Sequence, residues 1–121
     1  HKKLDGVDMA VLHNLMRNPI DGESIEFNDN RLSLYSAQKG KCAVTGKQME
    51  ADEVICIKKI PKEQGGTDKY SNLLLVCRKI QELLNVKDIK TFSEEMDKLN
   101  LDKKQSDKLL KLRSLAFVES C

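Results

Sequence analysis

The chain has 121 residues, of which 40% are hydrophobic and 33% are charged, a composition typical of a globular domain rather than of a disordered segment. The length suffices for one compact domain, so we expect residues 1–121 to fold as a single unit. The formal net charge of +2 permits nucleic-acid binding, but any basic face must be a local patch. No apolar run approaches the roughly 18 residues of a membrane span, so we expect no contact with a membrane.

The first part of the chain, residues 1–40, is predicted to be a helical flank. Apolar residues recur at a spacing of four, at Val7, Val11 and Leu15. This spacing predicts an amphipathic helix over residues 7–16, with Asp5 as its N-cap. After a loop or a short extended piece, a second helix is predicted over residues 29–39, where Gly40 would end it in the left-handed conformation.

The central part, residues 41–85, combines strand and helix signals. Three runs are rich in residues that favour strands: residues 42–44, 53–57 and 73–76. Between the last two runs, Pro61–Tyr70 contains two adjacent glycines and is typical of a flexible connection. Helix formers then run from Cys77 to Leu84.

Residues 86–121 are predicted to form a pair of helices. The first spans roughly residues 87–99 and has four apolar side chains on one face: Ile89, Phe92, Met96 and Leu99. The second begins at a capping box made by Asp102 and Gln105. Helices around one small β element predict the α+β class. The core is expected to draw on Val7, Val11, Leu32, Tyr35, Val76, Ile80, Leu84, Phe92, Met96, Leu112 and Leu115.

The four cysteines contain no C-x-x-C pair. Cys56 and Cys77 lie inside apolar runs, which favours free buried thiols in a reducing compartment, and we expect a cytoplasmic protein without a signal peptide. A zinc site is the alternative, but the chain has neither a thiol pair nor a His-x-x-x-His sequence to supply the ligands. His13, on the first predicted helix, is expected to be a surface or half-buried residue. We therefore predict no metal and no other cofactor.

Several pieces of the sequence occur in an order, and at separations, that resemble a known family. They are the central unit and the segments Phe27–Tyr35, Gln38–Gly46, Leu101–Gln105 and Lys111–Ala116. Together they resemble the C-terminal HNH endonuclease segment of bacterial group II intron reverse transcriptase–maturases, over roughly residues 7–116. The resemblance implies that residues 41–85 form an HNH-like ββα unit, flanked by helices, of the kind that holds one divalent metal.

In the resembled family the first strand ends in two adjacent histidines, a metal ligand and the general base that activates water. Those positions hold Ile57 and Lys58 here, and two further histidine positions on the helix hold Gln81 and Asn85. Ile57 has no ligand atom, and Lys58 is an ammonium at neutral pH unless it is strongly desolvated. Neutral amides are weak ligands for Mg²⁺. The resemblance thus implies a vestigial and inactive nuclease centre.

Two asparagines have alternative interpretations. Asn72 matches the family's middle asparagine, which helps to hold the loop that carries the base, but a turn residue entering a strand explains it equally well. Asn85 is also suited to cap the junction before Val86, and we favour this role over that of a ligand.

Six basic residues stand at positions that face DNA in the resembled family or open the adjacent helix: Lys58, Lys59, Lys62, Lys69, Arg78 and Lys79. The resemblance predicts that they contact phosphates. An ordinary solvated surface is the alternative, because Glu63, Asp68 and Glu82 lie among them. A contact surface elsewhere would most readily lie on the last helix, with Lys104, Lys108 and Lys111.

The sequence therefore predicts a degenerate, catalytically inactive HNH-like domain that helps a parent reverse transcriptase–maturase to hold target DNA or intron RNA. The expected partners are nucleic acid and the rest of the parent protein, and any polymerase chemistry lies outside these residues. Two alternatives remain. One is a structural or protein-interaction domain that binds no nucleic acid, and the other is an active HNH endonuclease with a rearranged site.

Overall fold

The computed structural model describes residues 3–4 and 7–116. These residues form five α-helices and a central antiparallel hairpin, which confirms the predicted α+β class. The hairpin consists of β3 (Val54–Lys58) and β4 (Leu73–Cys77), paired in register along their whole length. The strand β4 has apolar side chains on both of its faces. It therefore lacks the alternation of apolar and polar residues that is typical of a strand with one face in solvent.

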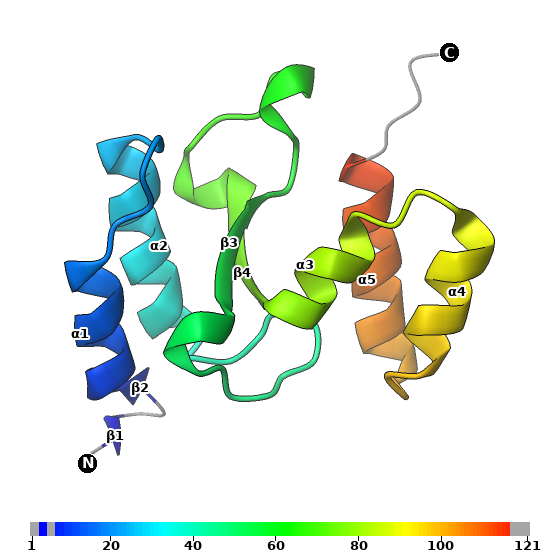
Figure 1. Cartoon of the computed structure of the whole chain (residues 1–121), viewed down its shortest axis with the longest axis horizontal. Coiled ribbons are helices and arrows are strands. Elements are labelled where there is room, and N and C mark those ends of the chain that lie inside the picture. The colour runs from blue at the N-terminus through cyan, green and yellow to red at the C-terminus, as the bar shows by residue number, and fades with distance from the viewer. Residues whose placement is uncertain (1–2, 5–6, 117–121) are drawn as a thin grey trace.

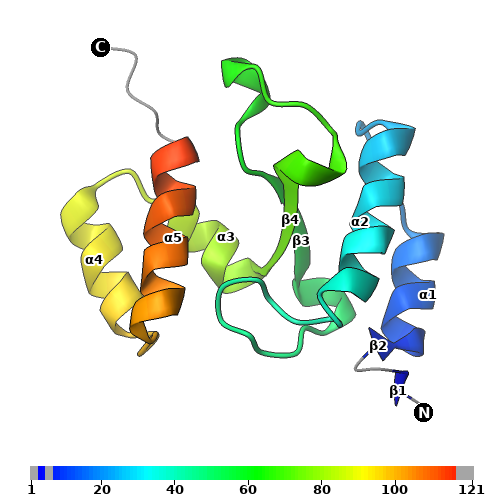
Figure 2. The same ribbon diagram turned by 180° about the vertical axis from the view of Figure 1, so that it is seen from behind.

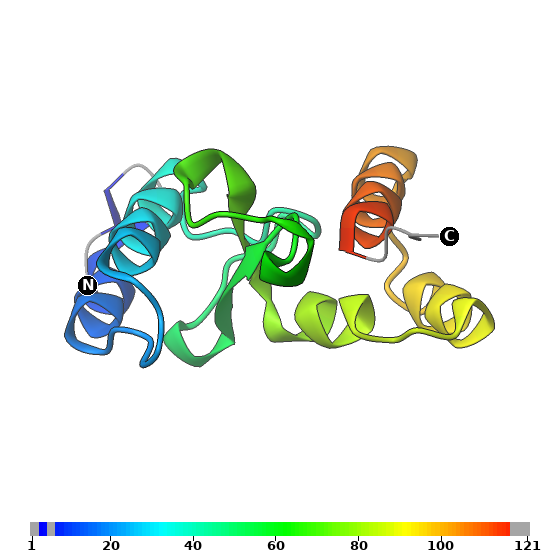
Figure 3. The ribbon, with the colours of Figure 1, turned by 90° about the horizontal axis from the view of Figure 1, so that it is seen from above.

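The helices divide into two groups on either side of the hairpin (Figure 1). One group contains α1 (Met9–Arg17) and α2 (Ile25–Ala37). The other contains α3 (Arg78–Leu84), α4 (Ile89–Asp97) and α5 (Lys103–Ala116). The view from above shows the same division, with the hairpin between the groups (Figure 3). Because α3 follows β4 directly, the order β3, β4, α3 is that of a ββα unit.

The first helix starts later than predicted. The chain first forms a short antiparallel pair of β1 (Lys3–Leu4) and β2 (Val7–Asp8), and α1 begins at Met9. Asp8 is the N-cap, and its carboxylate accepts two hydrogen bonds from backbone N–H groups of the first turn at 3.0 and 3.4 Å. The predicted start at residue 7 was wrong, because Asp8 is the N-cap residue; Asp5, the predicted cap, lies outside the described residues.

The second helix starts earlier than predicted. Ser24 caps it by accepting a hydrogen bond from the backbone N–H of Phe27 at 3.0 Å, so residues 25–28 are helical rather than part of a loop. Its end comes two residues earlier than predicted, because α2 stops at Ala37 and Lys39 is left-handed at φ +57° before the left-handed Gly40 at φ +71°. A Cβ atom at Gly40 would lie 2.8 Å from the hydroxyl oxygen of Tyr35, so only glycine fits there.

A buried arginine joins the two N-terminal helices. Arg31 on α2 is only 4% exposed, and its guanidinium donates hydrogen bonds to the carbonyl oxygens of Leu15 and Asn18, each at 3.3 Å. These carbonyls end α1, where a cation is favoured by the helix dipole. Burial lowers the pKa of Arg31, which shows that the buried charge has a cost in free energy. The two carbonyl partners offset this cost and fix the position of the guanidinium.

The segment between α2 and β3 passes across the lower end of the hairpin toward α5 (Figure 2). The predicted strand at residues 42–44 was wrong, because the chain turns back there. The N–H of Cys42 donates to the carbonyl of Lys47, and the N–H of Gly46 donates to the carbonyl of Cys42, both at 2.9 Å. A 3-10 turn, Ala51–Glu53, then leads into β3.

The free edge of β4 pairs with a side chain instead of a third strand. The carboxamide of Gln38 accepts a hydrogen bond from the N–H of Leu75 and donates one to its carbonyl, both at 3.0 Å. The N–H of Ala43 donates to the same carbonyl at 3.0 Å. Leu75 also pairs with Cys56 across the hairpin, and its side chain is fully buried. One residue therefore joins α2, the turn and both strands.

The C-terminal helices follow the predicted pattern with one exception. The capping box of α5 is confirmed, because Asp102 and Gln105 exchange hydrogen bonds at 2.7 and 3.1 Å. The amide of Gln105 also donates to the carbonyl of Thr45 at 3.0 Å and so ties α5 to the turn. Phe92 of α4 is buried, but Ile89, at the first helical position, is 61% exposed and does not share the burial of that face.

Most of the predicted core is buried. Its buried members are Val11, Tyr35, Val76, Ile80, Leu84, Phe92 and Leu112. Val7, Leu32 and Met96 pack against this cluster while partly exposed, and Leu115 is half-buried. The sequence did not indicate Phe27 and Met49, which are equally buried. No helix in the described part of the chain is long and apolar enough to cross a membrane.

Replacing Gln38 by alanine should destabilise the fold. The substitution removes both hydrogen bonds to Leu75 and leaves a part-buried N–H without its partner, at a cost of about 1–3 kcal/mol. Gln48→Ala is the matched control, because Gln48 is exposed and its hydrogen bond to the carbonyl of Gly40, at 3.2 Å, does not involve the edge of β4. Urea unfolding of the three proteins gives the comparison, and equal stabilities of the two variants would show that the edge of β4 does not depend on Gln38.

Candidate functional site

A cleft lies between the end of β3 and the helices α3 and α5. Its volume is about 300 Å³, and its lining comprises Ile57, Lys58, Lys59, Pro61, Glu63, Gln81, Leu84, Asn85 and Leu112. The lining includes both predicted strand positions, Ile57 and Lys58, and both predicted helix positions, Gln81 and Asn85. Four site residues predicted from two distant parts of the sequence therefore meet at one cleft.

The helix wall of this cleft carries amides. Gln81 and Asn85 are four positions apart on α3 and so share a face. Asn85 is the C-cap residue, and its N–H donates to the carbonyl of Glu82 at 3.1 Å. Asp88, rather than Asn85, caps the start of α4, so Asn85 ends one helix instead of opening the next. Neutral amides offer neither a general base nor a strong ligand for a hard cation.

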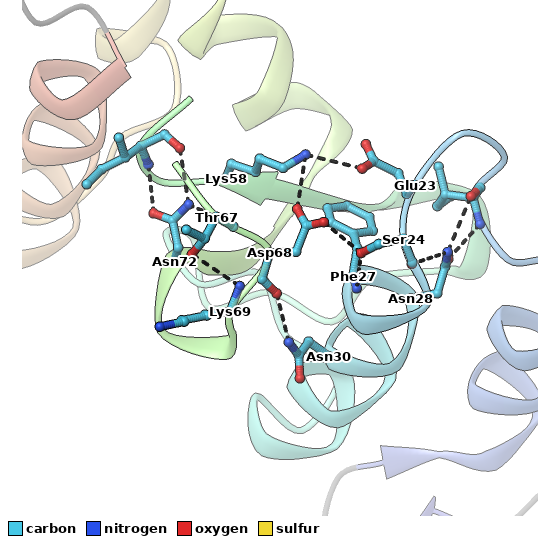
Figure 4. A network of polar contacts seen from close by, with 12 residues as sticks. Glu23, Ser24, Phe27, Asn28, Asn30, Lys58, Thr67, Asp68, Lys69 and Asn72 are labelled. Carbon is cyan, nitrogen blue, oxygen red and sulfur yellow. Dashed lines mark hydrogen bonds and ion pairs between the residues drawn. The ribbon is translucent and has the colours of Figure 1, made fainter. Parts of the chain in front are cut away.

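Lys58 borders the cleft, but its ammonium lies on the α2 side of the hairpin (Figure 4). Its Nζ is 3.2 Å from a carboxylate oxygen of Glu23, 3.5 Å from one of Asp68 and 4.8 Å from the centre of the Phe27 ring. Burial opposes the charge, but the hydrogen bond to Glu23 and the two carboxylates outweigh it and raise the pKa of Lys58. Lys58 is therefore a structural cation, not a base.

Asn72 holds the loop between the strands. Its amide oxygen accepts a hydrogen bond from the N–H of Ile60 at 2.9 Å, and its amide nitrogen donates to the carbonyls of Ile60 and Thr67 at 3.1 and 2.8 Å (Figure 4). A Cβ atom at Gly66 would lie 1.6 Å from the carbonyl oxygen of Ile60, so the closed loop requires glycine. Of the two interpretations of Asn72, the structure shows the loop-holding one.

The same loop is bonded to the start of α2. The hydroxyl of Ser24 donates to the carboxylate of Asp68 at 2.6 Å, and the amide of Asn30 donates to the backbone carbonyl of Asp68 at 2.9 Å (Figure 4). The Ser24 hydrogen bond, together with Lys58, holds the pKa of the Asp68 carboxyl below its usual value. These contacts turn the predicted flexible connection into a loop with a defined shape.

The six predicted basic residues lie at the two ends of the hairpin. Lys62 and Lys69 are exposed in the loop that precedes β4, whereas Arg78 and Lys79 follow β4 at its other end. Lys79 is 3.5 Å from Glu95, and the guanidinium of Arg78 donates to the carbonyl of Asp52 at 2.6 Å. Lys58 is paired as described. Lys62 and Lys69 therefore lie before one end of β4, and Arg78 and Lys79 lie after its other end.

Lysines gather instead in a neighbouring groove along α5. The groove has a volume of about 420 Å³ and shares Lys59 and Leu112 with the cleft. Its basic residues are Lys59, Lys104, Lys108 and Lys111, and its apolar floor is formed by Leu74, Leu112 and Leu115. The three helix lysines share a face of α5 because their spacing follows the helical repeat. These three lysines are the alternative contact surface that the sequence predicted on the last helix.

The groove has little negative charge. Asp107 is its acidic member, and its carboxylate is 3.3 Å from the ammonium of Lys103. Within the described residues, none of the four groove lysines makes an ion pair or a side-chain hydrogen bond. Their charges therefore face solvent, where they are available to an anion.

The remaining candidate ligands form no metal site. His13 is exposed on α1, as predicted for a surface residue. Cys42, Cys56 and Cys77 are free thiols, although Cys56 and Cys77 are half-buried rather than fully buried, and Cys121 lies outside the described residues. Among the described residues, no group of three or more His, Cys, Asp or Glu side chains is placed to hold a metal ion.

Comparison with protein-family models, with curated proteins and with solved structures finds no match to this chain.

Restoring imidazoles to the cleft should create a metal site. In Ile57→His/Gln81→His/Asn85→His, three histidines would line one cleft, and we expect Zn²⁺ to bind at least about tenfold more tightly than to the unmodified chain. The stability cost of replacing a half-buried isoleucine should be on the order of 1–3 kcal/mol.

The matched control is Ile57→His/Gln81→His/Glu82→His, in which the third histidine points away from the second because neighbouring helical positions do not share a face. Isothermal titration with Zn²⁺ compares the two variants. Equal affinities in folded proteins would show that β3 and α3 do not present their side chains to one site.

The Asp68 contacts predict a specific response to acid. Because the pKa of the Asp68 carboxyl is lowered in the fold, its contribution to stability is present above the unfolded value of about 4 and is lost as the pH falls through the lower folded value. The difference in unfolding free energy between the unmodified chain and Asp68→Asn should therefore narrow below about pH 4. Urea unfolding between pH 7 and pH 3 measures it, and a constant difference would contradict a charged Asp68 contact.

Proposed function

We propose that this chain is a degenerate HNH-like domain of a group II intron reverse transcriptase–maturase that has lost nuclease chemistry and binds nucleic acid through its phosphate backbone. The observation that carries the proposal is the groove along α5, where four lysines without acidic partners among the described residues line a surface that adjoins the vestigial cleft. The target DNA or the intron RNA would be the bound nucleic acid.

The loss of catalysis is supported by the chemistry of the cleft. Metal-assisted hydrolysis needs a bound ion to stabilise the leaving oxygen and a base to activate water. The cleft offers Ile57, two neutral amides and a single carboxylate, that of Glu63. The ammonium of Lys58, at the position of the base, is held in its charged form on the far side of the hairpin. An active centre with a rearranged site therefore has little support.

Phosphate binding is supported by the shape and charge of the groove. Lys104, Lys108 and Lys111 form a line along α5, and Lys59 extends it across to the hairpin. Phosphate contacts are read by charge and spacing and carry no sequence information, so backbone binding needs no base-specific side chains. With about four phosphates neutralised, the affinity should lie in the non-specific range of about 10⁻⁴–10⁻⁶ M.

The alternative of a protein-binding domain is favoured by the apolar floor of the same groove, formed by Leu74, Leu112 and Leu115. The two functions differ in their response to salt. Release of counterions makes phosphate binding fall steeply as the salt concentration rises, whereas burial of apolar side chains does not weaken in this way.

Charge reversal in the groove should weaken nucleic-acid binding. We expect the unmodified chain to bind duplex DNA or RNA about a hundredfold more weakly at 200 mM than at 50 mM salt. In Lys108→Glu/Lys111→Glu, the slope of the logarithm of the binding constant against the logarithm of the salt concentration should become shallower by about two units. Lys87→Glu/Lys90→Glu is the matched control, because it changes the net charge equally at exposed positions outside the groove. Fluorescence anisotropy with labelled duplexes measures both.

If both double variants bind equally well, the groove is not the contact surface. If the unmodified chain binds no nucleic acid even at low salt, the protein-binding alternative replaces the proposal. The same samples, incubated with supercoiled plasmid and Mg²⁺ or Mn²⁺, should leave the plasmid intact. Metal-dependent nicking by pure protein would overturn the inactive centre without bearing on the groove.

A further inference from the structure

Two cysteines that the proposed function does not use meet at the lower end of the hairpin. Cys42 lies in the turn after α2, and Cys77 is the last residue of β4. The backbone N–H of Cys77 donates to the sulfur of Cys42 at 3.3 Å, and the thiol of Cys77 hydrogen-bonds to the same sulfur. The hydrogen bond from Ala43 to Leu75, at 3.0 Å, holds the turn against β4, so the fold keeps Cys42 beside Cys77.

The surroundings of Cys42 favour a thiolate. Its side chain is only 2% exposed, which opposes a charge, but it accepts hydrogen bonds from Cys77 and from Thr45. The bond from the Cys77 thiol is the strongest influence, and together these donors lower the pKa of Cys42. The proton of the pair is correspondingly held on Cys77, whose pKa is raised.

Cys56 provides the contrast within the same hairpin. It has no comparable set of donors, and burial raises the pKa of its thiol to about 12. A thiol of this kind reacts slowly with disulfides, because the thiolate is the reacting species and Cys56 has no neighbouring sulfur to take its proton, whereas the thiol of Cys77 can pass its proton to Cys42. The described residues therefore contain one reactive pair of thiols and one thiol of low reactivity.

We propose that Cys42 and Cys77 are a reactive dithiol that closes to an intramolecular disulfide, with a small disulfide of the glutathione type as the oxidant. The bond would join the turn to the start of α3. Disulfides require Cα atoms about 4.4–6.8 Å apart, a separation compatible with side chains that already touch. This inference is independent of nucleic-acid binding and rests on the contacts of the two sulfurs.

The exchange has two balanced steps. The half-buried sulfur of Cys77 attacks one sulfur of glutathione disulfide as its proton passes along the hydrogen bond to Cys42, and one glutathione leaves as a thiolate that takes a proton from water. Cys42 then loses its proton to water, and its sulfur attacks that of Cys77 and displaces the second glutathione. Two protein thiols are oxidised to a disulfide, and one glutathione disulfide is reduced to two glutathione molecules.

The test uses the full chain with serine at the other two cysteines, Cys56→Ser/Cys121→Ser. After incubation with mixtures of reduced and oxidised glutathione, quenching with acid and alkylation with N-ethylmaleimide, mass spectrometry should show a monomer without maleimide adducts and with both thiol hydrogens lost. The matched variant Cys42→Ser/Cys77→Ser keeps the other two cysteines, and it should take up maleimide at both without an intramolecular bond.

Peptide mapping of the unmutated chain gives the same test if a serine substitution disturbs folding, and it should recover a Cys42–Cys77 linked peptide as the main cross-link. Full alkylation of both cysteines in the oxidised, folded protein would overturn the proposal. Disulfide-linked dimers as the main product, or a main cross-link through Cys56, would overturn it as well.

Discussion

The backbone of Leu75 is the point on which the rest of the structure depends. A two-stranded hairpin is marginal by itself, because each strand leaves a row of unpaired backbone groups and buries little surface. Here the backbone N–H and carbonyl of Leu75, on the unpaired edge of β4, are hydrogen-bonded by the amide of Gln38 and the N–H of Ala43. Gln38 lies at the end of α2, and Ala43 lies in the turn that follows it. The flanking helices then bury most of β4, with Leu75 at its centre, and leave most of β3 half-buried. The sheet needs no further strand because a helix and a turn supply its missing partners.

This arrangement determines where the candidate sites lie. Since α3 follows β4 without a linker, the fixed strand sets the direction of the helix that carries Gln81 and Asn85. On the other side of the cleft, Asn72 closes the loop from Ile60 to Thr67 and so fixes where β3 ends. The second group of helices is anchored separately, through the bond from Gln105 of α5 to Thr45. The cleft and the groove are therefore bounded by segments that are far apart in the sequence.

Local chemistry made much of this fold predictable. The strand around Cys56, the strand ending at Cys77 and the capping box of α5 carry their signals within a few residues, and all three are present. The turn at residues 42–47 was not predictable from β propensity, because tertiary bonds to β4 decide its course. The residues of the candidate site likewise differ in how far they could be predicted. Positions on one strand or one helix face were placed correctly, but the sequence could not show that Glu23 and Asp68 neutralise Lys58, since these partners are remote along the chain.

The pairing of Lys58 has a consequence for how the sequence can change. Any neutral residue at position 58 would leave the carboxylates of Glu23 and Asp68 next to each other without their cation, and unpaired charges near a protein interior are costly. Acceptable substitutions at position 58 thus depend on earlier substitutions at the other two positions, since residues in one ion-pair network do not act additively. In evolutionary terms Lys58 is entrenched: once the lysine and its two acids are in place, single mutational steps away from them lead through less stable intermediates.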